Sequence, residues 1–192
     1  SNEIEAKQII KPIKEKIKKQ FNTYIFGEDE DTLASVLVSE LNDRKQSLAF
    51  AESCTGGLLS SSITGIPGSS KVFKGSVVAY KNEIKSSILN VPDHLLRQYG
   101  AVSEEVAESM VIGLKTTLKC DWGIAISGIA GPDGGSDEKP VGLVYISIIS
   151  PNNEIKNIKK IFNSTRNRID IQRLSVNECL NSLRLILLSN KD

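Results

Sequence analysis

Four short segments of the chain carry residue types that could do chemistry. Each places small, polar or glycine residues after an apolar run, and they are residues 51–57 (AESCTGG), 64–70 (TGIPGSS), 80–85 (YKNEIK) and 127–135 (SGIAGPDGG). Ligands of α/β proteins bind beyond the ends of strands, where loops of this kind lie. We therefore take these four segments as the candidate site.

The first segment is typical of a turn from a strand into a helix. Ser53 and Thr55 precede Gly56 and Gly57, whose backbone N–H groups could approach an anion or a developing oxyanion at the N-terminus of a helix. The same residue types are also ordinary helix-entry residues. The segment is therefore either a site or a capped helix start.

Two of the segments are loops that could contact a ligand. The loop at 64–70 supplies hydroxyl groups and a flexible backbone that could hold a phosphate, but it lacks the glycine and lysine spacing of a Walker loop. On its residues alone, a plain turn explains it better. The loop at 127–135 contains four glycines, so it is either a binding loop or a wide structural turn.

Lys85 is the candidate proton acceptor. It follows the end of an expected strand, where desolvation by neighbouring loops would lower its pKa as a general base requires, although most lysines are exposed. His94 is the only histidine, and a surface position suits it better than a Ser-His-Asp triad. No HExxH, paired CxxC or clustered metal ligands occur. A serine activated by a lysine is then the simplest option without a metal.

The pattern of apolar residues predicts the elements that must position these groups. Five apolar runs read as strands, at 48–51, 72–80, 122–127, 141–149 and 155–162. Helical patterns separate most of them, and Ser103 is expected to cap one of these helices. Alternating strands and helices favour a three-layer α/β/α fold. Because the last two strands follow each other directly, the sheet should be mixed, with an antiparallel hairpin.

The first 30 residues read as a helical connector, a remnant of a two-domain architecture, and residues 31–192 read as the main domain. Ile10, Ile13 and Ile17 recur at helical spacing among lysines, and Pro12 should confine the helix to one side of it. The start at Ser1 without methionine suggests that more protein precedes it. The amphipathic connector and the apolar last helix make a homodimer plausible.

Composition narrows the classes of partner. Lys and Arg total 24 against 23 Asp and Glu, so a nucleic-acid-binding surface is disfavoured. Three widely spaced cysteines fit neither a disulfide framework nor a zinc site and favour the cytoplasm. The apolar stretch at 183–188 is far shorter than the roughly 20 residues of a membrane-spanning helix.

Taken together and in order, AESCTGG, PGSS (67–70), YKNEIK, GAVSE (100–104) and SGIAGPDGG resemble the C-terminal domain of the competence/damage-inducible protein CinA. The resemblance covers roughly residues 33–188. It implies hydrolysis of nicotinamide mononucleotide to nicotinate mononucleotide and ammonia in pyridine nucleotide salvage, with no metal and no organic cofactor. It also implies a preceding domain similar to molybdopterin-binding proteins in two-domain members.

The resemblance also implies roles for individual residues. Ser53 is the expected nucleophile with Ser70 as its alternative, Lys85 accepts and returns the proton, and Tyr80 orients the dyad or the substrate. Amides near Thr55, Gly56 and Gly57 are expected to stabilise the oxyanion. The suitable substrate donors are Gly68, Ser69, Ser127 and Gly131.

One arginine before the last helix belongs to the family pattern, and Arg166 matches it best. The family has a glycine and an aspartate before that arginine, whereas Ser164 and Thr165 stand here, so Arg168 is an alternative. The resemblance carries a pocket more reliably than it carries turnover. A catalytically silent nucleotide-binding or regulatory module of a two-domain protein is therefore the competing hypothesis, and calorimetric binding without ammonia release would favour it.

Overall fold

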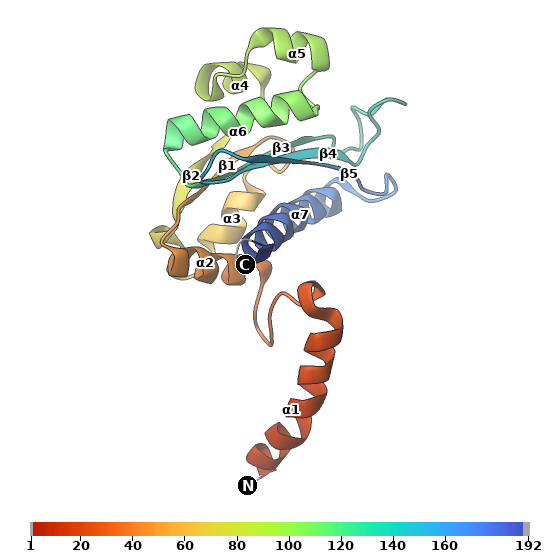
Figure 1. The fold of residues 1–192 in the computed structure, drawn as a ribbon. Helices are drawn as coiled ribbons and strands as arrows, with labels where there is room; N and C mark the ends of the chain where they lie inside the picture. Colours follow the sequence, from red (N-terminus) through yellow and green to blue (C-terminus); the bar gives the residue numbers. More distant parts are fainter. Residues whose placement is uncertain (1, 190–192) are drawn as a thin grey trace.

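A five-stranded mixed sheet forms the centre of the molecule in the computed structural model, which describes residues 2–189 (Figure 1). The strands are β1 (Leu48–Glu52), β2 (Phe73–Val78), β3 (Trp122–Gly128), β4 (Leu143–Ile149) and β5 (Ile155–Ile161). Their order is β2-β1-β3-β4-β5. β1 pairs in parallel with β2 and with β3, whereas β3–β4 and β4–β5 are antiparallel. The predicted mixed sheet with its hairpin is confirmed.

Helices cover both faces of the sheet. The helices of the described residues are α1 (Asn2–Phe21), which lies apart from the sheet, α2 (Leu33–Arg44), α3 (Leu58–Thr64), α4 (Asn82–Leu89), α5 (Asp93–Tyr99), α6 (Glu104–Leu118) and α7 (Arg168–Ser189), with two short 3-10 turns, η1 (Asn22–Tyr24) and η2 (Ser69–Lys71). Figure 1 shows α4, α5 and α6 above the sheet, and α2, α3 and α7 below it. The three-layer α/β/α prediction is confirmed.

Each layer of helices closes its own hydrophobic core. Leu37, Leu59 and Leu183 pack with Phe50 and Ile124 below the sheet. Above it, Met110 and Leu114 of α6 pack on small residues of the sheet, including Ala49 and Ala51 of β1. Burial of apolar side chains on both faces makes β1 a continuous apolar run rather than an alternating one.

Two helix starts follow the rules of capping. Thr32 and Ser35 form a reciprocal capping box at the start of α2. The hydroxyl of Ser103 accepts a hydrogen bond of 3.3 Å from the amide of Val106, so the predicted cap of α6 is confirmed.

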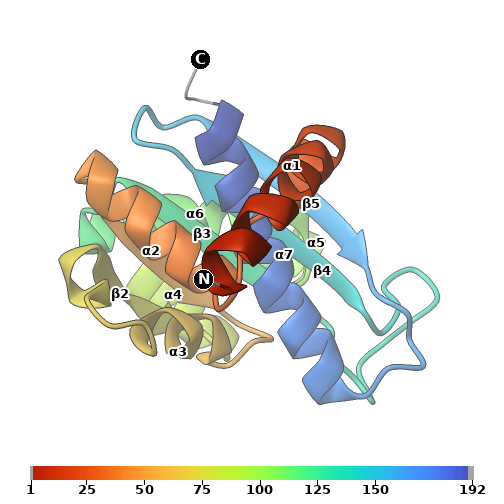
Figure 2. The same ribbon diagram turned by 90° about the horizontal axis from the view of Figure 1, so that it is seen from below.

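The connector differs from the sequence-based expectation. α1 runs through Pro12 without stopping, so the expected break at this residue is corrected; a proline inside a helix costs one hydrogen bond but does not require an end. None of its residues is buried. Figure 1 shows that α1 extends away from the sheet. Figure 2 shows α2 and α7 side by side on the face of the sheet from which α1 extends.

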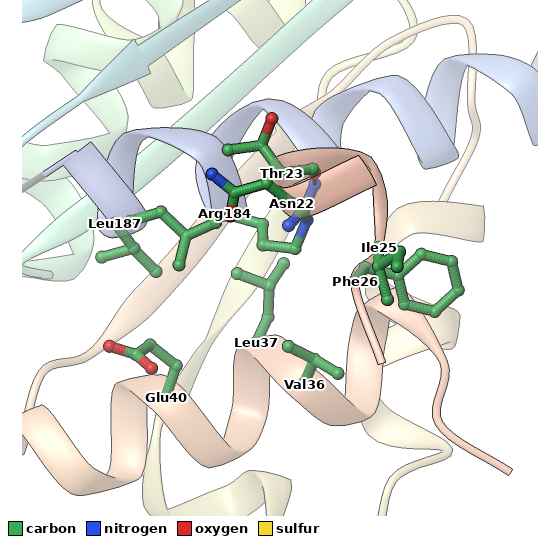
Figure 3. Close-up of a pocket in the computed structure, with 10 residues that line it drawn as sticks. Asn22, Thr23, Ile25, Phe26, Val36, Leu37, Glu40, Arg184 and Leu187 are labelled. Carbon is green, nitrogen blue, oxygen red and sulfur yellow. Dashed lines mark hydrogen bonds between the residues drawn. The ribbon is translucent and has the colours of Figure 1, made fainter. Parts of the chain in front are cut away.

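Arg184 of α7 ties the end of the connector to the main domain. Its side chain is buried, and its guanidinium donates a hydrogen bond of 2.6 Å to the carbonyl of Thr23. A cavity of about 200 Å³ lies between residues 22–26, α2 and α7, with Arg184 in its wall (Figure 3). Within residues 2–189, none of the helices has the length and apolar character needed to cross a membrane.

Candidate active site

The end of β1 presents Ser53 at the carboxyl edge of the parallel strands. The amide of Ser53 donates to the carbonyl of Ile126 in β3, and the amide of Ala79 after β2 donates to the carbonyl of Glu52 at 2.7 Å. These bonds join the ends of three parallel strands. Ser53 itself is only 9% exposed.

The carboxylate of Glu52 fixes the turn that follows Ser53. It is fully buried and accepts hydrogen bonds from the amides of Gly57 (2.9 Å), Leu59 (3.1 Å) and Ser60 (2.8 Å). The hydroxyls of Thr55 and Ser60 also donate to it. A buried charge needs such partners, and the positive end of α3 adds to them. The turn is therefore held from inside by one side chain.

Lys85 reaches Ser53 from the first turns of α4. Helical side chains point back toward the N-terminus of their helix, which directs this one to the Ala79–Tyr80 segment and the end of β1. Its Nζ atom lies 3.3 Å from Ser53 Oγ, 2.7 Å from the carbonyl oxygen of Ala79 and 3.5 Å from that of Tyr80. The side chain is 1% exposed, and burial lowers the pKa of its amine below the ordinary value.

A cavity of about 260 Å³ opens beside this pair. The residues predicted from the sequence that line it are Ser53, Tyr80, Lys85, Ser127 and Gly131, and Arg168, the alternative to Arg166, lines it as well. They come from the ends of β1, β2 and β3, from the loop after β3, from α4 and from the start of α7. The structure thus brings three of the four candidate segments to one place.

Arg168, rather than Arg166, is the arginine of this cavity. Arg168 is the first residue of α7, and its guanidinium donates to the hydroxyl of Tyr80 (2.7 Å) and to the carbonyl of Gly131 (2.8 Å). Arg166 lies in the preceding turn, is exposed and does not line the cavity. Of the two arginines expected from the sequence, the structure brings Arg168 to the cavity and not Arg166.

Thr55, Gly56 and Gly57 lie close to the site but face away from the cavity. The Thr55 hydroxyl and the Gly57 amide are bonded to Glu52, and the Gly56 amide donates to the carbonyl of Ser53 at 3.1 Å. The amides of Gly56 and Gly57 are thus not free to hold an oxyanion. Among the described residues, the amides of Cys54 and Thr55 donate to no other residue, and Cys54 lines the cavity.

Gly68, Ser69 and Ser70 lie at the other edge of the sheet. α3 runs back from the carboxyl edge after β1, so the loop that follows it meets the start of β2, where Leu48 donates to the carbonyl of Val72. Leu48 and Ser53 stand at opposite ends of β1. Within one chain, the structure does not bring these three residues to the cavity lined by Ser53 and Lys85.

Some contacts of the site were not predicted from the sequence. Gln172, one turn after Arg168 in α7, donates to the carbonyl of Cys54 at 2.8 Å. Lys139 donates to the carbonyls of Tyr99 (2.6 Å) and Val102 (2.8 Å), and these bonds anchor the glycine-rich loop that follows β3. The hydroxyl of Ser127 donates to the carbonyl of Ala101 at 2.6 Å. Among the residues that fix the site and were not predicted, only Glu52 could have been recognised in the sequence, because it is a single acid between an apolar strand and a helix start.

The chemistry open to the site is that of a hydroxyl nucleophile. Cys54 also lines the cavity, but burial raises the pKa of its thiol to about 12, so it stays protonated near neutral pH. No group of three or more histidine, cysteine or acidic side chains that could hold a metal ion occurs in the described part of the chain. Ser53 and Lys85 are the hydroxyl and the amine that lie within hydrogen-bond distance of each other in the wall of the cavity.

Comparison with known proteins gives consistent matches. Residues 30–187 match the family model of the CinA C-terminal domain. A CinA-like protein of Prochlorococcus marinus subsp. pastoris is 69% identical over 98% of this chain and 44% of its own length. A CinA-like protein of Thermosynechococcus vestitus is 47% identical over 98% of this chain and 45% of its own length. The chain thus spans less than half the length of these curated relatives.

Solved structures agree in fold and sequence. The competence/damage inducible protein CihA from Agrobacterium tumefaciens is 34% identical with a TM-score of 0.79, and the match covers 85% of this chain and 98% of that one. A CinA superfamily protein from Klebsiella pneumoniae is 30% identical with a TM-score of 0.77, over 82% of this chain and 96% of that one.

Proposed function

Because the chain belongs to the CinA C-terminal domain family, we propose that it is an amidohydrolase acting on nicotinamide mononucleotide. The products are nicotinate mononucleotide and ammonia. The observation that carries the proposal is the 3.3 Å separation between Lys85 Nζ and Ser53 Oγ in the wall of a cavity. An amine with a lowered pKa beside a hydroxyl is the arrangement that activates serine without histidine.

The contacts of Lys85 suit a neutral amine. A neutral amine has two N–H donors and one lone pair. The carbonyls of Ala79 and Tyr80 can accept from the two N–H groups, which leaves the lone pair for the O–H of Ser53. No carboxylate forms an ion pair with this amine in the described residues, and burial is the largest influence on its pKa.

In the proposed reaction, Ser53 Oγ attacks the carboxamide carbon while its proton moves to Lys85. The tetrahedral intermediate then expels ammonia, which takes the proton from the Lys85 ammonium as the C–N bond breaks. Water attacks the resulting ester of Ser53 with Lys85 again accepting a proton, and the return of that proton to Ser53 Oγ releases the carboxylate product.

The remaining residues of the cavity bind and orient the substrate. The free amide of Cys54 follows the nucleophile directly, the position from which one oxyanion donor comes in other serine hydrolases. Arg168 supplies a fixed positive charge for the phosphate, since Tyr80 and Gly131 hold its guanidinium in place. Ser127 and the loop at Gly131 offer further polar contacts.

The test is ammonia release from nicotinamide mononucleotide by the purified chain and by Ser53→Ala side by side. The proposal requires release by the first and at most trace release by the second. No release by the parent chain, together with binding of the nucleotide in calorimetry, would instead support a silent binding module.

A further inference from the structure

The cavity beside Ser53 contains a carboxylate that the mechanism does not use. Three formally charged side chains line the cavity, and they are Lys85, Arg168 and Asp133. Asp133 is the only acid among the lining residues. With Lys85 present as the free amine, the lining carries one positive and one negative charge.

Asp133 has no partner of its own in the part of the chain that the structure describes. It makes no hydrogen bond and no ion pair there. Arg168, the nearest candidate in the cavity lining, already directs its guanidinium to Tyr80 and Gly131. The charge of Asp133 is therefore free to face whatever occupies the cavity.

The loop that carries Asp133 is shaped and anchored. Gly131 and Gly134 flank the acid and both have positive φ, +74° and +87°, a backbone conformation that favours glycine. Lys139 fastens the far end of the loop to the carbonyls of Tyr99 and Val102. Asp133 is exposed at the rim, but its loop is held against the body of the protein at both ends.

We infer that Asp133 recognises the positive charge of a pyridinium ring and makes the site select oxidised over reduced nicotinamide nucleotides. The inference rests on the proposed function, because it takes the ring that carries the scissile carboxamide as the ligand. Nicotinamide mononucleotide has a cationic ring at one end and an anionic phosphate at the other. The dihydropyridine form has the same shape and phosphate but a neutral ring.

The size of the cavity makes the charge effective. Asp133 and Ser53 line the same cavity, and a charge acts over about 8 Å in physiological saline. A ring whose carboxamide carbon contacts Ser53 therefore lies within the field of Asp133. For a carboxylate at a solvent-exposed rim, we expect a preference of about three- to tenfold.

Binding separates this effect from chemistry, because the two ring forms also differ in the reactivity of their amides. The measurement is calorimetry with the Ser53→Ala chain, titrated with nicotinamide mononucleotide and with its reduced form. The oxidised form should bind about three- to tenfold more tightly. In Ser53→Ala/Asp133→Asn, its affinity should fall to that of the reduced form, whose own affinity should not fall.

Two variants control for structure and for net charge. Asp137→Asn removes the same charge from the same loop at an exposed residue that does not line the cavity, and it should keep the preference. Asp133→Glu should keep most of it. Equal weakening of both ring forms by Asp133→Asn, or an undiminished preference, overturns the assignment of Asp133 alone. Failure of Ser53→Ala to bind nicotinamide mononucleotide at all contradicts the proposed function instead.

Discussion

The Nζ atom of Lys85 lies 3.3 Å from the Oγ atom of Ser53, although 32 residues separate them in the chain. Two parallel strands create this contact, because β1 and β2 end at the same edge and the helices after them start there. Ser53 directly follows β1, and Lys85 lies in α4, the helix that follows β2. The pair therefore depends on strand register more than on any loop.

Replacing Ser53 by alanine removes the proposed nucleophile without disturbing the buried turn around Glu52. We expect ammonia release to fall by about 10³-fold or more. Ser70→Ala is the matched control, since Ser70 is exposed at the opposite edge of the sheet. It should retain full activity. Equal losses in both variants, measured as kcat for nicotinamide mononucleotide, would contradict the placement of the site.

The pH profile should report the state of Lys85. The amine accepts a proton only when neutral, so kcat/KM should be low in acid and rise with pH through the pKa of this group. Burial lowers that pKa, so the midpoint of the rise should lie below the roughly 10.4 of an ordinary lysine. Lys85→Arg keeps the positive charge and cannot lose its proton, so it should be inactive across the range. A rise centred at the ordinary lysine value would argue against the proposed base.

Arg168 and Arg166 form a natural pair for mutation. Arg168→Gln removes charge-assisted hydrogen bonds inside the cavity, and we expect KM for nicotinamide mononucleotide to rise roughly ten- to hundredfold. Arg166→Gln removes the same charge two residues earlier, outside the cavity, and should change KM less than about twofold. The reverse ranking of the two variants would restore the role expected for Arg166.

Glu52→Gln should destabilise the protein as well as the site. The carboxamide of glutamine would point an N–H group at amides that donate to the carboxylate of the parent protein. We expect this to lower the free energy of unfolding by about 2–4 kcal/mol. For a chain of this length, that corresponds to a melting temperature lower by roughly 5–15 °C. Glu105→Gln, an exposed acid in the first turn of α6, is the control and should shift it by about 2 °C at most. Indistinguishable melting of the two variants in calorimetry would show that Glu52 does not hold the turn.

The sequence predicted the fold well because apolar runs and turn residues alternate clearly. Each of the five predicted strands overlaps an observed one, and their ends differ by at most two residues. The strand expected over 72–80 stops at Val78, since the carbonyls of Ala79 and Tyr80 instead accept hydrogen bonds from Lys85. Burial of that lysine is a tertiary effect that no local pattern contains.

The errors in the site have physical causes of the same kind. The loop at 67–70 follows a helix rather than a strand, and this alone sends it to the far edge of the sheet. The amides of Gly56 and Gly57 have suitable positions in the sequence. In the structure, however, the Gly57 amide donates to the buried Glu52 carboxylate and the Gly56 amide donates to the Ser53 carbonyl. The choice between Arg166 and Arg168 depended on a helix start that sequence patterns locate only to within a few residues.

The most direct test of the account is a titration of the amine of Lys85 itself. Nuclear magnetic resonance of the chain with ¹³C at the lysine ε-carbons follows each amine with pH, and the signal missing from Lys85→Arg identifies the one of interest. The account predicts that this signal titrates below the pH of the other lysines and at the same pH as the rise in kcat/KM. A Lys85 signal that titrates with the exposed lysines would mean that the residue is an ammonium ion near neutral pH, and it could not then take the proton of Ser53.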